Sequence, residues 1–326
     1  MHTPLIKKTL TSLASILLAM ACTSAQAQWR PSKPVHVVMP FSPGGTAEAI
    51  LRAVTDPLHD RLGQPVIIDS RPGGGQLIAA REVARSPADG YNILGASPSI
   101  LTFPLLTNTK FDLLKELVPV IHIGDSAIVV AVNADVPAKS FQELIQFMKA
   151  NPGKINYGIT GNGSPQHLAG ELIKVRAGVE MTAVPYKGSS ILLPDLLSGR
   201  VQLTIDGVTT LLPHASSGKI RFLALTNGSR TKVMQGVPTL AESGLPGFNL
   251  APWNGFLVPI GTPKEIITTL NRETDTIVKT DAFAEQLGRT AGGIAKGGSP
   301  EQFAEVIRQD IEQYTRIIAT TGIKAE

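Results

Sequence analysis

Two glycine-rich loops are the segments of this 326-residue chain that could do chemistry. Phe41-Ser42-Pro43-Gly44-Gly45-Thr46 follows an apolar run and precedes a stretch with helical periodicity, and Thr160-Gly161-Asn162-Gly163-Ser164 has the same setting further along. Glycine lets a backbone approach a ligand closely, and the first turn of a helix carries unpaired N–H groups with a partial positive charge. Each loop is therefore a candidate anion site. If they faced each other, they would hold a small molecule by an acidic group at either end.

Polar residues at other predicted strand ends could line the same cleft, because open α/β sheets place ligands at the carboxyl ends of their strands. Some of these residues also have a purely structural interpretation. Phe41 could belong to the core, Glu48 could only complement a helix dipole, and Asp206 could be a turn residue. Lys187, like Tyr186, follows a strand and could contact the ligand or link the lobes, although a solvated lysine is the commoner interpretation. The candidate ligand-binding residues are Phe41, Ser42, Gly44, Gly45, Thr46, Glu48, Ser70, Gly73, Ser97, Thr160, Gly161, Gly163, Ser164, His167, Tyr186 and Asp206.

Motifs for metal, nucleotide or nucleophile chemistry are absent from the sequence. The six histidines are widely spaced, without an H-E-x-x-H pattern, so we expect no metal site. The segment 161–166 begins like a dinucleotide fingerprint but lacks its third glycine, and there is no phosphate loop or nucleophile elbow, so we expect no cofactor. A hydrolase that uses Ser164 and His167 is an alternative, although Ser164 also suits the N-cap of a helix.

Short apolar strands alternate with amphipathic helices, a pattern that predicts an α/β fold with mainly parallel sheets. The expected strands are Val35–Met39, Pro65–Asp69, Tyr91–Ala96, Ala127–Val132, Ile155–Tyr157, Thr182–Pro185, Val201–Ile205, Arg221–Thr226 and Gly255–Pro259. The expected helices are Ala47–Leu62, a short one ending near Arg85, Ser140–Ala150, Pro165–Ala177, one near Ser190–Leu197, one with Pro263 in its first turn, and a final helix with Ser299 as N-cap and Pro300 at its first position.

The first 27 residues are typical of a secretory signal peptide. Lys7 and Lys8 precede an apolar run, and Ala25-Gln26-Ala27 matches a cleavage site. Cleavage there would remove the chain's one cysteine, so we expect an exported protein without disulfides. Lipid attachment at Cys22 is disfavoured, because Ala19 poorly matches the residue required three positions earlier.

Charge and composition limit the kinds of partner that we expect. Loss of Lys7 and Lys8 reduces the formal net charge from +4 to +2, and the chain has no basic tail, so nucleic acid is not expected as a partner. No later segment is apolar enough to cross a bilayer, which predicts a soluble mature protein. With 43% apolar residues, the chain can build sizeable cores, and its length suits two domains.

Several ordered motifs resemble the Bug family, the periplasmic solute-binding components of tripartite tricarboxylate transporters. The resemblance covers nearly the whole chain after the signal peptide. It is carried by Pro40 to Gly45 (PFSPGG), Asp69 to Gly75 (DSRPGGG), Asp89-Gly90-Tyr91, Tyr157 to Gly170 (YGITGNGSPQHLAG), Val184 to Gly188 (VPYKG) and Val237 to Gly247 (VPTLAESGLPG).

This resemblance implies a two-lobed periplasmic clamp with two crossing hinge strands. Lobe 1 would comprise residues 28–128 plus 255–326, and lobe 2 residues 129–254. It also implies a non-enzyme, expected here as a monomer, that closes on a small carboxylate between the two loops and delivers it to membrane transporter subunits. A ligand-sensing adaptor for a signalling receptor is the alternative.

Three departures from the family pattern leave the ligand open. Glu48 stands where the family usually has aspartate, Ser70 stands where it has asparagine, and Gln76-Leu77-Ile78-Ala79 replaces a commoner continuation of small residues.

Overall fold

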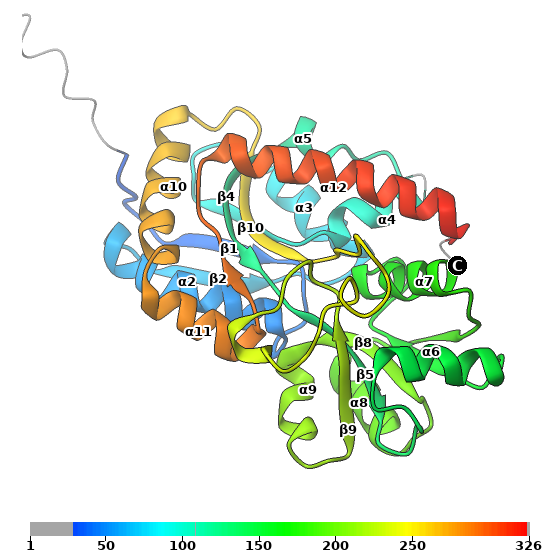
Figure 1. Ribbon diagram of the computed structural model, residues 1–326. Coiled ribbons are helices and arrows are strands. Elements are labelled where there is room, and N and C mark those ends of the chain that lie inside the picture. The colour runs from blue at the N-terminus through cyan, green and yellow to red at the C-terminus, as the bar shows by residue number, and fades with distance from the viewer. Residues whose placement is uncertain (1–28, 108, 325–326) are drawn as a thin grey trace, which may run out of the picture. The chain divides into compact units, whose positions relative to one another are not determined.

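Two β-sheets flanked by helices make up the fold of residues 31–326 (Figure 1). The computed structural model describes residues 29–107 and 109–324, so the predicted signal peptide and Cys22 lie outside the described residues. In the part that is described, no helix combines the length and the apolar character that crossing a membrane requires.

The first sheet has six strands in the order β11-β4-β10-β3-β1-β2. β1 pairs in parallel with β2 and β3, whereas β10 runs antiparallel to β3 and β4, and β11 antiparallel to β4. The strands are β1 (Val35–Met39), β2 (Val66–Ser70), β3 (Asn92–Ala96), β4 (Leu117–Asp125), β10 (Trp253–Pro259) and β11 (Ile294–Ala295).

The second sheet has five strands in the order β7-β6-β8-β5-β9. β6 pairs in parallel with β7 and β8, and β5 runs antiparallel to β8 and β9. The strands are β5 (Ile128–Asn133), β6 (Asn156–Ile159), β7 (Thr182–Pro185), β8 (Leu203–Gly207) and β9 (Ile220–Leu225). The prediction of two sheets flanked by helices is confirmed, but the pairing is mixed rather than mainly parallel. Every antiparallel pair includes β4, β5 or β10, the strands next to the two segments that cross between the sheets.

Helices follow most of the strands. Those near the first sheet are α2 (Thr46–Leu62), the 3-10 turn η2 (Gly74–Gln76), α3 (Leu77–Ala84), α4 (Ser99–Thr107), α5 (Leu113–Glu116), α10 (Lys264–Val278), α11 (Asp281–Ala291) and α12 (Pro300–Thr321). Those near the second are α6 (Phe141–Ala150), α7 (Pro165–Ala177), α8 (Ser189–Leu197), α9 (Val208–Ala215) and the 3-10 turn η3 (Lys232–Met234). Figure 1 shows α10 and α11 at one side of the first sheet and the long α12 passing across it.

Side-chain caps explain where several helices start. Ser140 caps α6, Thr280 caps α11, and Ser299 forms a capping box with Gln302 at α12, where Pro300 occupies the first turn as predicted. A cap of this kind accepts a hydrogen bond from an N–H group that the helix itself leaves unpaired, and contributes about 1 kcal/mol. Local sequence therefore helps to set where these helices begin.

The chain crosses between the sheets twice, and the two crossings are bonded to each other. The Ser126 N–H donates to the Pro252 carbonyl at 2.8 Å, and Asn254 Nδ2 donates to Ser126 Oγ at 2.9 Å. Next to them, the buried Trp253 donates its indole N–H to Asp310 of α12 at 2.8 Å and packs edge-on against Phe303. These contacts tie the terminal helix to the strand that leaves the crossing.

Candidate functional site

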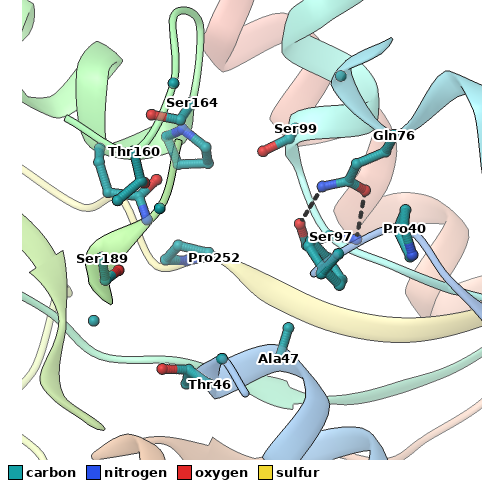
Figure 2. A pocket seen from close by; sticks show the side chains of 18 of the residues that line it. Pro40, Thr46, Ala47, Gln76, Ser97, Ser99, Thr160, Ser164, Ser189 and Pro252 are labelled. Atoms are coloured by element: carbon teal, nitrogen blue, oxygen red, sulfur yellow. Dashed lines mark hydrogen bonds between the residues drawn. The ribbon is translucent and has the colours of Figure 1, made fainter. Parts of the chain in front are cut away.

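A cavity of about 510 Å³ lies between the carboxyl ends of the two sheets (Figure 2). Six strand-to-helix loops line it, three from each sheet. From the first sheet come the loops that follow β1, β2 and β3, and from the second those that follow β6, β7 and β8. Because parallel strands point their carboxyl ends to the same edge, this topology gathers the loops into one site.

The cavity wall is polar but carries little charge. Lys187 and Asp206 are the only ionisable side chains among the described residues that line it. The remaining polar groups are hydroxyls, amides and backbone, and the loops lead into the N-termini of α2, α4, α7, α8 and α9. Helix N-termini attract anions through their N–H groups and dipoles. The site is therefore built to receive negative charge without an arginine clamp.

The first glycine-rich loop leaves the start of α2 without a side-chain cap. Gly45 occupies the N-cap position, with φ −93° and ψ 172° and no side-chain hydrogen bond. Glu48 turns back instead, and its Oε2 accepts from the Gly44 N–H at 2.6 Å while Oε1 pairs with Arg52 at 2.7 Å. The Gly44 N–H and Arg52 lower the pKa of Glu48. Glu48 thus anchors the loop and does not line the cavity.

The second loop is closed by bonds of its own. Ser164 Oγ accepts from the His167 N–H at 3.2 Å, so Ser164 is the N-cap of α7. The Gly163 N–H donates to His167 Nδ1 at 3.1 Å, and Thr102 Oγ1 of α4 donates to the Gly163 carbonyl at 2.6 Å. Since an N–H can only donate, Nδ1 holds the lone pair in this bond and cannot at the same time take a proton from Ser164.

The opposing loops approach each other closely at Gly207. A Cβ atom at this position would stand 3.1 Å from Thr46 Oγ1, so the first turn of α2 lies against the loop that follows β8. A Cβ atom there would require the Thr46 side chain to shift by a few tenths of an ångström.

Asp206 is the acidic group of the wall. Its side chain is 3% exposed, Oδ1 accepts from the Gly207 N–H at 2.7 Å, and Oδ2 has no hydrogen-bond partner among the described residues. Burial raises the pKa of Asp206, against the opposing effect of the Ser189 hydroxyl, the Gly207 N–H and the Gln166 amide. Because Asp206 is buried, has one oxygen without a hydrogen bond and lies beside an anion site, its protonated, neutral form is favoured.

Gln76 and Ser97 form a bonded pair on the wall that the first sheet contributes. Gln76 Nε2 donates to Ser97 Oγ at 2.7 Å, and the Ser97 N–H donates to Gln76 Oε1 at 3.3 Å. Figure 2 shows this pair with Ser99 on one side of the cavity, and Thr160, Ser164 and Ser189 on the other.

The structure brings most of the predicted site residues to the cavity. Those that line it are Phe41, Ser42, Gly45, Thr46, Gly73, Ser97, Thr160, Gly161, Gly163, Ser164 and Asp206. Gly44, Glu48, Ser70, His167 and Tyr186 do not line it. Ser70 Oγ donates to the Phe41 carbonyl at 2.6 Å, and the Tyr186 hydroxyl donates to Asp195 Oδ2 at 2.8 Å, so both stand behind the wall. Burial and Asp195 raise the pKa of Tyr186 to about 12.

Sequence reasoning missed several groups that line the cavity. They are Gln76, Ser99, Thr102, Ser126, Gln166, Ser189 and Asn254, together with Lys187, for which a solvated lysine is the commoner interpretation. Gln76 and Ser189 follow predicted strands and could have been found by applying the strand-end rule to every strand. Ser126 and Asn254 belong to the crossings, for which the local sequence holds no signal.

Comparison with known proteins places this geometry in context. Residues 50–323 match the model of a family described as the tripartite tricarboxylate transporter family receptor. Protein BugT of Bordetella pertussis is 33% identical over 320 residues, which cover 97% of this chain and 98% of the relative.

Two solved structures extend the comparison. Rpa4515 of R. palustris with adipate superposes with a TM-score of 0.85 at 36% identity, covering 90% of this chain and 99% of that chain. MatC of Rhodopseudomonas palustris with bound malate gives a TM-score of 0.78 at 25% identity, covering 88% and 99%.

Proposed function

Because the chain belongs to the tripartite tricarboxylate transporter receptor family, we propose that it binds a small organic dicarboxylate in the cavity between its sheets and delivers it to a membrane transporter. The observation that carries this proposal is the convergence of six loops, with their helix N-termini, on a cavity that has two ionisable side chains. Both ligands named for the similar solved structures, adipate and malate, carry a carboxylate at each end.

Opening and closing would let the protein capture and release this ligand. In this proposal, residues 28–128 plus 255–326 form one lobe and 129–254 the other, and the bonded crossings at Ser126 and Pro252 are the hinge. A hinge closure that favours the liganded state needs only a few residues to change their backbone angles. The mature protein would act in the periplasm as a monomer after the loss of residues 1–27.

We propose binding without turnover. Ser164 Oγ accepts the His167 N–H as the cap of α7, and His167 Nδ1 accepts the Gly163 N–H. Nδ1 is therefore not available as the base that a Ser164 nucleophile would need.

A thermal-shift series tests the proposal. Mono- and dicarboxylates should raise the unfolding temperature of the protein by mass action, with dicarboxylates the most effective. Gly45→Leu should abolish the shift, because position 45 lines the cavity, has an ordinary φ and leaves open space where a Cβ atom would stand, with no protein atom within 4 Å. The ligand-free variant should still fold.

Gly236→Leu is the matched control. Gly236 also lacks neighbours within 4 Å of its Cβ position, but it lies in an exposed turn away from the cavity. Equal ligand shifts in Gly45→Leu and in the wild-type protein would rule out this cavity as the binding site. The absence of a shift with any carboxylate would rule out the ligand class.

A further inference from the structure

Gln76 has an unusual backbone conformation for its residue type. Among the described residues it is the only non-glycine residue with a positive φ, at 76°. The left-handed region costs an L-residue about 1–2 kcal/mol, and such strain concentrates at ligand sites. Gln76 is also only 4% exposed and lines the cavity. The fold holds this side chain in place at an energetic cost.

The orientation of the Gln76 amide follows from its partners. The backbone N–H of Ser97 can only donate, so the atom that accepts from it at 3.3 Å must be the oxygen, Oε1. Nε2 therefore faces Ser97 Oγ, to which it donates at 2.7 Å. Because Ser97 Oγ accepts in that bond, its own proton remains available for a further partner.

The pair consequently presents donors to the cavity. One N–H of Gln76 and the O–H of Ser97 are not used in the bonds that join the two residues, whereas Oε1 is already engaged. Neither residue carries a charge. Figure 2 shows the pair across the cavity from the loop that holds Thr160 and Ser164.

We propose that the Gln76–Ser97 pair binds one carboxylate of the ligand and makes this end of the cavity select an acceptor group over a donor group. The inference rests on the proposed function. A carboxylate offers two oxygens to the two donors, whereas an ammonium group would meet the free N–H of Gln76 and find both oxygens of the pair already accepting one hydrogen bond each, so it would not fully replace its own hydrogen bonds to water. Gln76 is thus a specificity-determining residue of this chain.

Isothermal titration of Gln76→Glu tests this selection. The probes are the dicarboxylates from succinate to suberate, each paired with the ω-amino acid of the same length. Glutamate keeps the size of glutamine and the acceptor for the Ser97 N–H, but it replaces the donor by a charged oxygen. We expect the tightest-binding dicarboxylate to lose about 100-fold in affinity through like-charge repulsion, while the ω-amino acid of equal length loses less or gains.

Two further variants separate this role from folding. Gln142→Glu, on the exposed side of α6, makes the same change of charge away from the cavity and should leave both affinities unchanged. Gln76→Gly removes the donor and also the backbone strain, so it should bind dicarboxylates about tenfold more weakly while its ligand-free form unfolds no more easily than the wild type.

The outcomes distinguish this inference from the proposed function. If the wild-type protein binds dicarboxylates and Gln76→Glu keeps the same ratio of dicarboxylate to ω-amino acid affinity, the selection role is wrong and the proposed function stands. If Gln76→Glu does not fold, unchanged binding by Gln76→Gly overturns the inference equally. If the wild type binds no dicarboxylate, the inference fails together with the proposed function.

Discussion

The two glycine-rich loops share a sequence pattern but present different groups to the cavity. At the first loop, Gly45 gives α2 no side-chain cap, and Gly45, Thr46 and Ala47 line the cavity, so no capping oxygen competes for the first N–H groups of the helix. At the second loop, Ser164 caps α7, Pro165 has no N–H, and Gly163 is bonded on both its N–H and its carbonyl. The residue just before the helix decides between these two outcomes.

In the proposed binding mode, the two loops therefore have different roles. The first loop resembles an open anion site, whose donors gain a strong partner only when a ligand arrives. The second loop is closed by hydrogen bonds with His167 and with Thr102 of α4, the helix that follows β3 of the first sheet. A glycine pattern therefore predicts a close approach and a helix start, but it does not predict whether the N–H groups are available.

The largest effect on binding is expected from giving the first loop a side-chain cap. Gly45→Asp places a carboxylate at an N-cap position whose φ and ψ already suit one, which should stabilise the ligand-free protein by up to about 1 kcal/mol. The same carboxylate should repel the ligand and weaken dicarboxylate binding about 100-fold, measured by titration calorimetry. Gly236→Asp, in an exposed turn, is the control. Unchanged affinity in Gly45→Asp would mean that the start of α2 does not hold the anion.

A second test compares the glycines themselves. Gly163 has φ 73° and a Cβ there would press on Leu106, so Gly163→Ala should reduce the free energy of unfolding by about 2 kcal/mol. Gly45→Ala, with an ordinary φ and open space, should reduce it by less than about 1 kcal/mol, through the poorer N-cap preference of alanine alone. Urea unfolding measures both. Equal losses would show that the second loop is no more constrained than the first.

Glu48, which holds the first glycine-rich loop, and Asp206, at the end of β8, have pKa values shifted in opposite directions. The pKa of Glu48 is lowered, so Glu48 stays ionised, whereas burial raises the pKa of Asp206. As pH rises through the raised pKa, Asp206 ionises and repels a bound carboxylate, so affinity should fall with pH, by roughly tenfold in total. Asp206→Asn keeps an acceptor for the Gly207 N–H and should flatten this dependence. A pH profile that is the same in both proteins would assign the titration to another group.

The raised pKa of Asp206 also determines how its contribution to the free energy of unfolding changes with pH. The neutral acid is favoured in the folded state, so the contribution of Asp206 to stability is fully present below its unfolded pKa and is lost as pH rises through the folded one. The difference in unfolding free energy between Asp206→Asn and the wild type, both without ligand, should therefore move in favour of the variant with rising pH.

The smallest expected effect concerns the cap of the second loop. Ser164→Ala removes the acceptor for the His167 N–H and should reduce the free energy of unfolding by about 1 kcal/mol. The affinity for dicarboxylates should fall only several-fold, because the second loop offers few unbonded N–H groups to a ligand and mainly shapes the cavity wall. Chemical unfolding and calorimetry give the two numbers. A loss of binding as large as that of Gly45→Asp would make the loops equivalent after all.

Local signals account for the parts of the fold that the sequence predicted well. The bounds of β1, β7 and α7 agree with prediction, and the capped start of α12 was found from Ser299 and Pro300. No strand was predicted over Leu117–Asp125, where Pro119 interrupts an apolar run, although β4 lies between β10 and β11. α4 was missed because it is apolar on all sides and contains Pro104.

The site was predictable wherever one residue and its neighbours set the geometry. Glycine runs after strands located both loops. The roles of Glu48 and His167 depend on bonds that their sequence positions allow but do not require, and Gln76 depends on Ser97, which is 21 residues away. Contacts across that distance are set by tertiary packing, which a single sequence does not reveal.

The arrangement of three loops from each sheet also bears on how a bound molecule leaves. In the proposed hinge opening, a small separation of the two sheets would break about half of the contacts to the ligand at once. Affinity would then depend steeply on the angle between the sheets. A transporter that separated them slightly could release a tightly held ligand without competing with any single strong bond.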